Sequence, residues 1–267
     1  MRSSTDVWAI SRSISDLSLT PPGTVQQRDN LCGPFHAARL LSDAGVAEFE
    51  GQRLDQDLVA LHAGTALPEV EVGPQVPPGA VNLRDYRFEL PRVDQASSGT
   101  RLPGLVSAIE KLGGGRLVCV PLRGGWTAAT VEGLLAGVAD TRTRLIANVR
   151  TGHFWGSRPP LDALLAALDG AEVADPPPAE WDVGHFVELL QLLRGRRGTL
   201  VLVRDSYPSL GWTGVHLQPP SAVAAALHRG DGRDGGVLAV GPPDDAAAVE
   251  RLASDLGLEV KMWDNRS

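Results

Sequence analysis

Two apolar runs separated by a short turn constrain the fold of this chain most strongly. The first covers residues 185–193, the second covers residues 199–205, and the segment between them reads Arg-Gly-Arg-Arg-Gly. Apolar runs joined by a short glycine-containing turn are typical of an antiparallel β-hairpin. The start of the first strand then lies beside the end of the second, because the turn is at the far end. The sequence therefore predicts that His185 and Asp205 are neighbours.

A cysteine stands at the predicted start of a helix. Residues 32–44 carry an apolar face and are followed by Gly45, a typical helix stop. A thiol at a helix N-terminus faces the positive end of the helix dipole and unpaired backbone N–H groups, which favour the thiolate. Cys32 is therefore predicted to be a nucleophile.

The residues before this cysteine supply side-chain amides. Gln26 lies six residues before Cys32, and we expect its amide to stabilise a developing oxyanion together with the backbone N–H of Cys32. Such donors lower the barrier by about 3–4 kcal/mol each in well-studied enzymes. Gln27 and Asn30 are alternative donors.

The hairpin supplies a base for the thiol. An imidazole that faces a thiol with one nitrogen and a carboxylate with the other gives the nucleophile, base and orienting group of acyl transfer. We therefore predict Cys32 as nucleophile, His185 as base and Asp205 as the group that orients the imidazole.

Each of these residues also has a purely structural interpretation. Cys32 could be a core residue, and Asp205 could begin an Asx turn. His153 is a rival base, but no following strand ends in aspartate. His36 lies four residues after Cys32 on the same helix face, but two ligands do not make a metal site. No metal or cofactor is expected, and Cys119 is expected in the core.

The remaining pattern predicts an alternation of helices and strands. Helices are expected at residues 54–62, 102–112, 127–138, 161–168, 221–227 and 244–256, and strands at residues 117–120, 145–149, 237–240 and 258–262. Residues 64–100 are rich in proline and glycine and are predicted to be an irregular insertion that could cover a substrate groove. We expect a catalytic domain over residues 1–230. Residues 231–267 are predicted as a strand–helix–strand extension that either extends the main sheet or forms an appendage.

Composition excludes several classes of partner. The formal net charge is −7, so no basic excess attracts nucleic acid or anionic lipid. No apolar run approaches the roughly 18 residues of a membrane span, and residues 1–16 lack the apolar core of a signal peptide. Two cysteines cannot form a disulfide framework. A reducing, cytoplasmic location is the expectation.

The order of these motifs resembles that of the papain-like cysteine peptidases. The nearest likeness is to the bacterial branch that includes the double-glycine leader peptidases of bacteriocin processing. The matching stretches are residues 26–34, residues 185–187 and residues 201–205. Two features of this chain differ from the pattern of that branch. Residues 45–140 must include inserted material, and Asp205 is not followed directly by proline. No exporter segment follows, so the leader-peptide substrate does not carry over.

The resemblance implies an α+β papain-like fold in which an N-terminal catalytic helix packs on an antiparallel sheet. It implies a cysteine peptidase-like hydrolase that cleaves a peptide or amide bond through a Cys-His-Asp triad and a thioester. One alternative is an acyltransferase that moves an acyl group to an amine. Another is an inactive module that binds a peptide or protein. The expected partner is a peptide or acylated substrate, such as a precursor peptide or a carrier protein.

Overall fold

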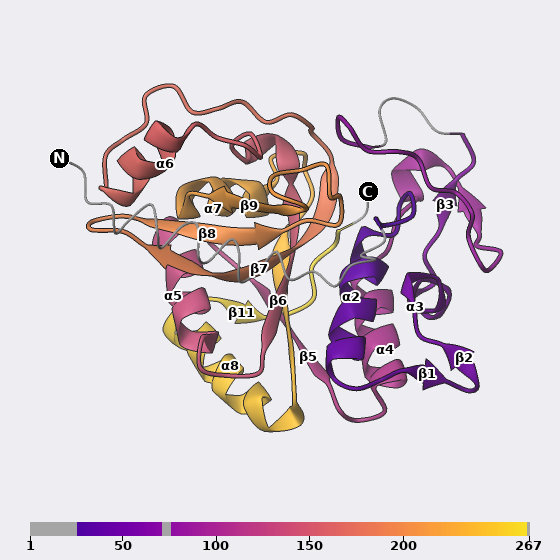
Figure 1. Cartoon of the computed structure of the whole chain (residues 1–267). Coiled ribbons are helices and arrows are strands. Elements are labelled where there is room, and N and C mark those ends of the chain that lie inside the picture. Colours follow the sequence, from indigo (N-terminus) through magenta and orange to yellow (C-terminus); the bar gives the residue numbers. More distant parts are fainter. Residues whose placement is uncertain (1–25, 71–75, 266–267) are drawn as a thin grey trace.

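The structure is a computed structural model and describes residues 26–70 and 76–265. The described residues form a mixed α+β fold around one seven-stranded antiparallel sheet (Figure 1). Residues 1–16, in which no signal peptide is expected, lie outside the described residues. The strands of the sheet, in spatial order, are β11 (Glu259–Val260), β5 (Val118–Arg123), β10 (Gly236–Gly241), β6 (Arg144–Arg150), β7 (Gly184–Arg194), β8 (Thr199–Arg204) and β9 (Val215–Gln218).

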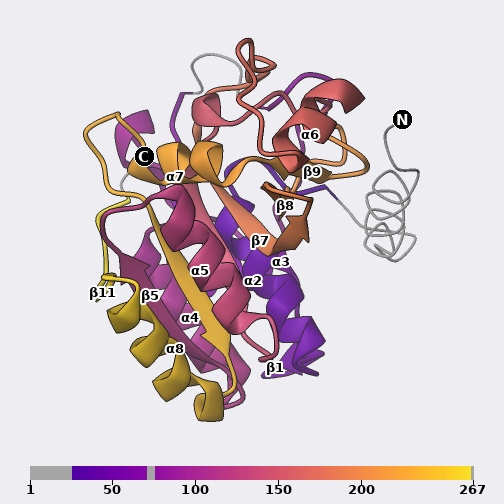
Figure 2. The same ribbon diagram turned by 90° about the vertical axis from the view of Figure 1, so that its left-hand side faces the viewer.

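Helices cover both faces of this sheet. One group consists of α2 (Cys32–Asp43), α3 (Gln56–Ala63) and α4 (Leu102–Gly113), and the other consists of α5 (Ala128–Val138), α7 (Pro220–His228) and α8 (Pro243–Asp255). Figures 1 and 2 show the two groups on opposite sides of the sheet. A further helix, α6 (Leu161–Leu168), packs against β8.

The alternation of side chains along the strands creates two cores. Ile146 and Leu238 pack with the α2, α3 and α4 side chains, whereas Ala147 and Val237 pack with those of α5, α7 and α8. Successive side chains of a strand point to opposite faces. Strands that are apolar at every position therefore lie in the middle of a three-layer structure.

The predicted hairpin is confirmed. β7 and β8 pair antiparallel, and Leu193 lies opposite Leu200 near the turn. A register shift between Leu189 and Gln191 marks an irregularity in the pairing. His185 is the second residue of β7, and Asp205 directly follows β8.

The C-terminal tail extends the main sheet, which is one of the two outcomes that the sequence leaves open for residues 231–267. β10 lies between β5 and β6 and pairs with both. All six residues of β10 are buried, which is typical of a central strand covered on both faces. The boundary at residue 231 therefore does not separate two sheets.

The predicted irregular insertion, residues 64–100, contains short elements in the part that the structure describes, residues 64–70 and 76–100. They are β3 (Leu67–Pro68), which pairs parallel with β4 (Arg92–Val93), and the 3-10 turn η1 (Gln95–Ser97). The chain also forms a small hairpin of β1 (Glu48–Phe49) and β2 (Gln52–Arg53) and a second 3-10 turn, η2 (Thr151–His153).

Most other predicted elements appear within a few residues of the expected bounds. The helix expected at residues 161–168 has those bounds as α6. The helix expected from residue 54 begins at Gln56, because the Asp55 side chain caps it by accepting from the Leu58 N–H. The strand β9 was not predicted, because four residues before a proline pair give too short a pattern. No helix of the described residues has the length and apolarity needed to cross a membrane.

Candidate active site

The first helix and the central hairpin bring Cys32 and His185 together. Cys32 is the first residue of α2, and its thiol lies close enough to the His185 imidazole for each group to shift the pKa of the other. The close approach depends on Gly33, because a Cβ there would lie 3.2 Å from Cδ2 of Phe186. The glycine after the cysteine thus lets the start of α2 pack directly on the start of β7.

Asp205 binds the other side of the imidazole. His185 Nε2 lies 3.2 Å from Asp205 Oδ1, so Nδ1 remains for the thiol. Both side chains are buried. The Asx-turn interpretation of Asp205 also holds, because Asp205 Oδ1 accepts from the Tyr207 N–H at 3.1 Å. One carboxylate therefore both closes the turn after β8 and orients the imidazole.

The charges of these three groups stabilise one another. Burial raises the pKa of the Cys32 thiol, but the charge and hydrogen bond of His185, with the backbone N–H groups of Phe186 and Gly33, bring it below the usual value. Burial lowers the pKa of His185, but Asp205 and Cys32 raise it to about 10. Burial raises the pKa of Asp205, yet the attraction of His185 leaves it lowered. The site therefore favours a thiolate beside an imidazolium.

Aromatic rings enclose the imidazole. The ring of Trp181 meets that of His185 edge-on at a centroid distance of 5.1 Å, and the ring of Tyr207 stacks on it at 6.0 Å. Trp181 and Tyr207 thus contact the proposed base directly. Excluding water from the His185–Asp205 pair strengthens their attraction.

A second histidine contacts Asp205 and was missed in the sequence. His216 Nε2 lies 4.0 Å from Asp205 Oδ2, and His216 Nδ1 accepts from the Gln218 side-chain amide at 3.0 Å. Because an amide nitrogen can only donate, His216 carries its proton on Nε2, towards Asp205. Burial lowers the pKa of His216, so the ring is neutral. The signal in the sequence was a His and a Gln two residues apart, which share one face of a strand.

The three candidate oxyanion donors have different surroundings. The Gln26 side-chain amide donates to the Val81 carbonyl, and Gln26 does not line the cavity described below. Gln27 is buried and accepts from the Ser206 hydroxyl, which itself lies 3.4 Å from His185 Nε2. Asn30 lines the cavity beside Cys32, and its buried Nδ2 has no hydrogen-bond partner among the described residues. The geometry thus favours Asn30 over Gln26 as the available amide.

The irregular insertion holds the segment that precedes Cys32. The buried Asp29 carboxylate accepts from the Leu83 N–H at 3.0 Å and from Arg84 Nε at 3.1 Å. The Tyr86 hydroxyl donates to the Asp29 carbonyl at 3.0 Å. Part of residues 64–100 therefore positions the turn that carries Asn30.

A charged cluster around a buried carboxylate lies behind the site. Glu188 on β7 is fully buried and accepts hydrogen bonds from Arg39 on α2 and Arg204 on β8. His36, four residues after Cys32, is also fully buried, and no described residue hydrogen-bonds to its ring nitrogens. Burial lowers the pKa of His36, and the charge of Arg39 lowers it further, to about 3.

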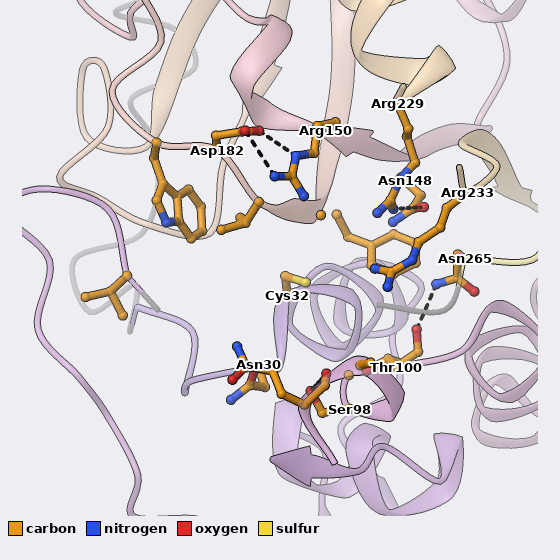
Figure 3. A pocket seen from close by; sticks show the side chains of 18 of the residues that line it. Asn30, Cys32, Ser98, Thr100, Asn148, Arg150, Asp182, Arg229, Arg233 and Asn265 are labelled. Atoms are coloured by element: carbon orange, nitrogen blue, oxygen red, sulfur yellow. Dashed lines mark hydrogen bonds and ion pairs between the residues drawn. The ribbon is translucent and has the colours of Figure 1, made fainter. Parts of the chain in front are cut away.

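A cavity of about 1000 Å³ opens beside the thiol. Its lining combines Cys32 with aromatic, amide and charged side chains from several segments (Figure 3). The polar residues include Asn30, Ser98, Thr100, Asn148, Arg150, Glu180, Asp182, Arg229, Arg233 and Asn265. The site therefore has room for a substrate next to the nucleophile.

The rival candidates lie in other surroundings. His153 Nε2 bonds to the Arg229 carbonyl at 3.1 Å. Burial raises the pKa of Cys119, which opposes thiolate formation there. Among the described residues, no group of three or more His, Cys, Asp or Glu side chains is arranged to hold a metal ion.

Comparison with known proteins identifies a family without assigning an activity. A family model described as "Family of unknown function (DUF6885)" matches residues 16–264. A search of curated proteins gave no match.

Proposed function

We propose that this chain, which belongs to the family of unknown function DUF6885, is a papain-like cysteine hydrolase that cleaves a peptide or amide bond. The observation that carries the proposal is the chain of contacts from Cys32 through His185 to Asp205. The nucleophile begins a helix, and the other two groups come from the sheet against which that helix packs.

The chemistry would proceed through a thioester. The Cys32 thiolate attacks the substrate carbonyl carbon, and the carbonyl oxygen takes the negative charge. When the tetrahedral adduct collapses, the C–N bond breaks and His185 gives its proton to the leaving amine. His185 then accepts a proton from water, whose oxygen attacks the thioester. Cleavage of the C–S bond releases the acid and regenerates the thiolate.

The oxyanion requires hydrogen-bond donors that are present before the reaction. The backbone N–H of Cys32 at the start of α2 is one proposed donor. The second is a side-chain amide, and both Gln26 and Asn30 remain candidates. The unpartnered, buried Nδ2 of Asn30 supports Asn30. Of the variants Gln26→Ala and Asn30→Ala, the one with the slower acylation of Cys32 identifies the donor.

Transfer of the acyl group to an amine shares the first half of this mechanism. The volume of the cavity supports it as a second candidate, because about 1000 Å³ leaves room for an amine beside a bound acyl group. Trapping the adduct that forms on Cys32 in a cell extract, and weighing it, distinguishes the two. A bound peptide fragment favours the hydrolase, and a bound fatty or other carrier-derived acyl group favours the transferase.

Alkylation with iodoacetamide at neutral pH tests the proposal itself. We expect Cys32 to react at least about tenfold faster than glutathione, because its lowered pKa increases the thiolate fraction. The variant His185→Ala should lose this advantage, whereas the control His153→Ala should keep it. Labelling of Cys32 no faster than that of glutathione would contradict the enzyme and favour an inactive binding module.

A further inference from the structure

We propose that the cavity beside Cys32 binds a carboxylate of the substrate through the guanidinium groups of Arg229 and Arg233. The inference rests on the proposed function and adds a substrate class to it. The carboxylate is either the free C-terminus of a peptide or the side chain of an Asp or Glu near the bond that is attacked.

The charges of the cavity are unevenly distributed. Asp182 and Arg150 form an ion pair, and Arg229, Arg233 and Asn265 lie together on another side (Figure 3). Asp231 connects the two groups, because it pairs with Arg229 at 2.9 Å and lies 3.6 Å from Arg150. Glu180, the neighbour of Trp181 in the chain, also lines the cavity and accepts from the Ser157 hydroxyl at 2.7 Å.

The side with the two arginines carries no lining carboxylate. Its other polar residues are amides and a hydroxyl, from Asn148, Asn265 and Thr100. Asn265 is held in place, because it accepts from the Leu102 N–H at 2.7 Å and donates to the Thr100 carbonyl at 2.9 Å. Asp231 balances the charge of Arg229, so Arg233 leaves one positive charge in excess on this side, which suits an anion.

Arg229 is fixed before any ligand arrives. Its side chain is almost fully buried, and its backbone has a φ of 62°, which is strained for a residue other than glycine. Its Nε and Nη2 donate to the carboxylate of Asp231 at 3.2 and 2.9 Å, and its Nη1 donates to Asn148 Oδ1 at 2.9 Å. A guanidinium has five N–H groups, so one on each terminal nitrogen remains for a ligand.

The sequence leaves room for this side chain at the start of β7. A Cβ at Gly184 would lie only 2.6 Å from Arg229 Nη2. The glycine directly before the proposed base therefore allows the Arg229 guanidinium to lie against the strand that carries His185. The proposed carboxylate site and the proposed base would then both be positioned by the strand β7.

Arg233 is the arginine of the cavity lining whose positive charge is not paired with a carboxylate of the described residues. Arg229 is paired with Asp231, and Arg150 with Asp182. The Arg233 guanidinium lines the cavity and forms no ion pair with any residue in the described part of the chain. Guanidinium groups match the planar, two-oxygen geometry of a carboxylate, and a peptide substrate carries its negative charge in that form.

A pair of alkylating reagents of similar size tests this site without knowledge of the substrate. Iodoacetate carries the carboxylate and iodoacetamide is its neutral counterpart. The measurement is the ratio of their rates at Cys32 in the full chain, at low salt. We expect Arg233→Gln to lower the iodoacetate-to-iodoacetamide ratio about fivefold, the size of effect of one nearby charge at a protein surface.

The matched control is Arg251→Gln, which removes the same charge from an exposed position on α8. It should leave the ratio at the wild-type value. Equal ratios in the wild type and Arg233→Gln would overturn the carboxylate site, even where Cys32 reacts rapidly with iodoacetamide. Slow reaction of wild-type Cys32 with iodoacetamide would instead contradict the proposed function, so the two failures are distinguishable.

Protection of Cys32 from iodoacetamide identifies the source of the carboxylate. The probes are N-acetyl-alanyl-alanine with its C-terminal amide as the control, and N-acetyl-aspartyl-alanine amide with its asparaginyl counterpart. Better protection by the first acid than by its amide supports a free C-terminus, and better protection by the aspartyl peptide supports an acidic side chain. If neither acid protects better than its neutral counterpart, the carboxylate assignment is overturned.

Discussion

At the scale of single residues, the environment of Cys32 differs sharply from that of Cys119. Cys32 has an imidazole and two backbone N–H groups beside its sulfur, and these outweigh the effect of burial on its pKa. Cys119 has burial and the charge of Glu110, which both raise its pKa. The thiolate is thus favoured at Cys32 and disfavoured at Cys119.

The pKa shifts of Cys32 and His185 predict how the rate of Cys32 alkylation depends on pH. The thiolate forms as pH rises through the lowered pKa of Cys32, so the iodoacetamide rate should reach half its plateau at a pH below about 8.5, the value of an ordinary thiol. His185 stays protonated until about pH 10. The rate should rise again above that pH, because a thiolate that loses its imidazolium partner is more nucleophilic.

The measurement is the rate of Cys32 alkylation between pH 4 and pH 11, followed by mass. In His185→Ala the lower midpoint should move up towards that of an ordinary thiol. A wild-type midpoint at or above that of glutathione would contradict the ion pair.

At the scale of elements, the junction of α2 with β7 and β8 decides the geometry of the site. Gly33 permits the close packing of α2 on Phe186. Behind it, Glu188 on β7 binds Arg39 on α2 and Arg204 on β8. The charged cluster therefore joins the three elements that carry the proposed nucleophile, base and orienting group.

This cluster predicts a large loss of stability from a small change. Glu188→Gln keeps the size of the side chain but removes the buried carboxylate that Arg39 and Arg204 share. It leaves Arg39 with Asp43 at 3.6 Å. Removing one partner of a fully buried ion pair costs about 3–5 kcal/mol. We expect a loss of about 2–3 kcal/mol, because both arginines are partly exposed. Urea denaturation measures the free energy of unfolding, and Glu250→Gln at an exposed position of α8 is the control. A loss below about 1 kcal/mol, equal to that of the control, would show that the cluster does not hold these elements together.

At the scale of the whole molecule, the two ends of the described chain meet at one sheet. α2 packs on one face of β7, and β10 from the last part of the chain lies beside β6 in the middle of the sheet. Asn265 and Arg233 then reach the cavity that Cys32 lines. The tail is therefore a part of the proposed active site and of the core.

The position of β10 predicts the result of removing the tail. A chain truncated after residue 230 loses the strand that pairs with both β5 and β6. It also loses Trp263, which is buried in the core beneath α2 and α4. We expect this truncated chain to lack a cooperative thermal transition in circular dichroism. Cooperative unfolding near the wild-type temperature would mean that the tail is an appendage after all.

The sequence by itself determined the local elements and the neighbours that a single turn brings together. The hairpin pattern was enough to pair His185 with Asp205, because strand register near a short turn depends on nearby residues. The helix that starts at Cys32 was equally visible, because its apolar spacing and its glycine stop are local signals.

Only the tertiary structure decided what these elements contact. Segments far apart in the chain are joined by the approach of Cys32 to His185, by the place of β10 inside the sheet and by the hydrogen bond from Arg229 to Asn148. Short-range patterns carry no information on such contacts, because they depend on how whole faces pack. The contact of His216 with Asp205 and the preference for Asn30 over Gln26 came from the structure for the same reason, since burial and missing partners are properties of the folded chain.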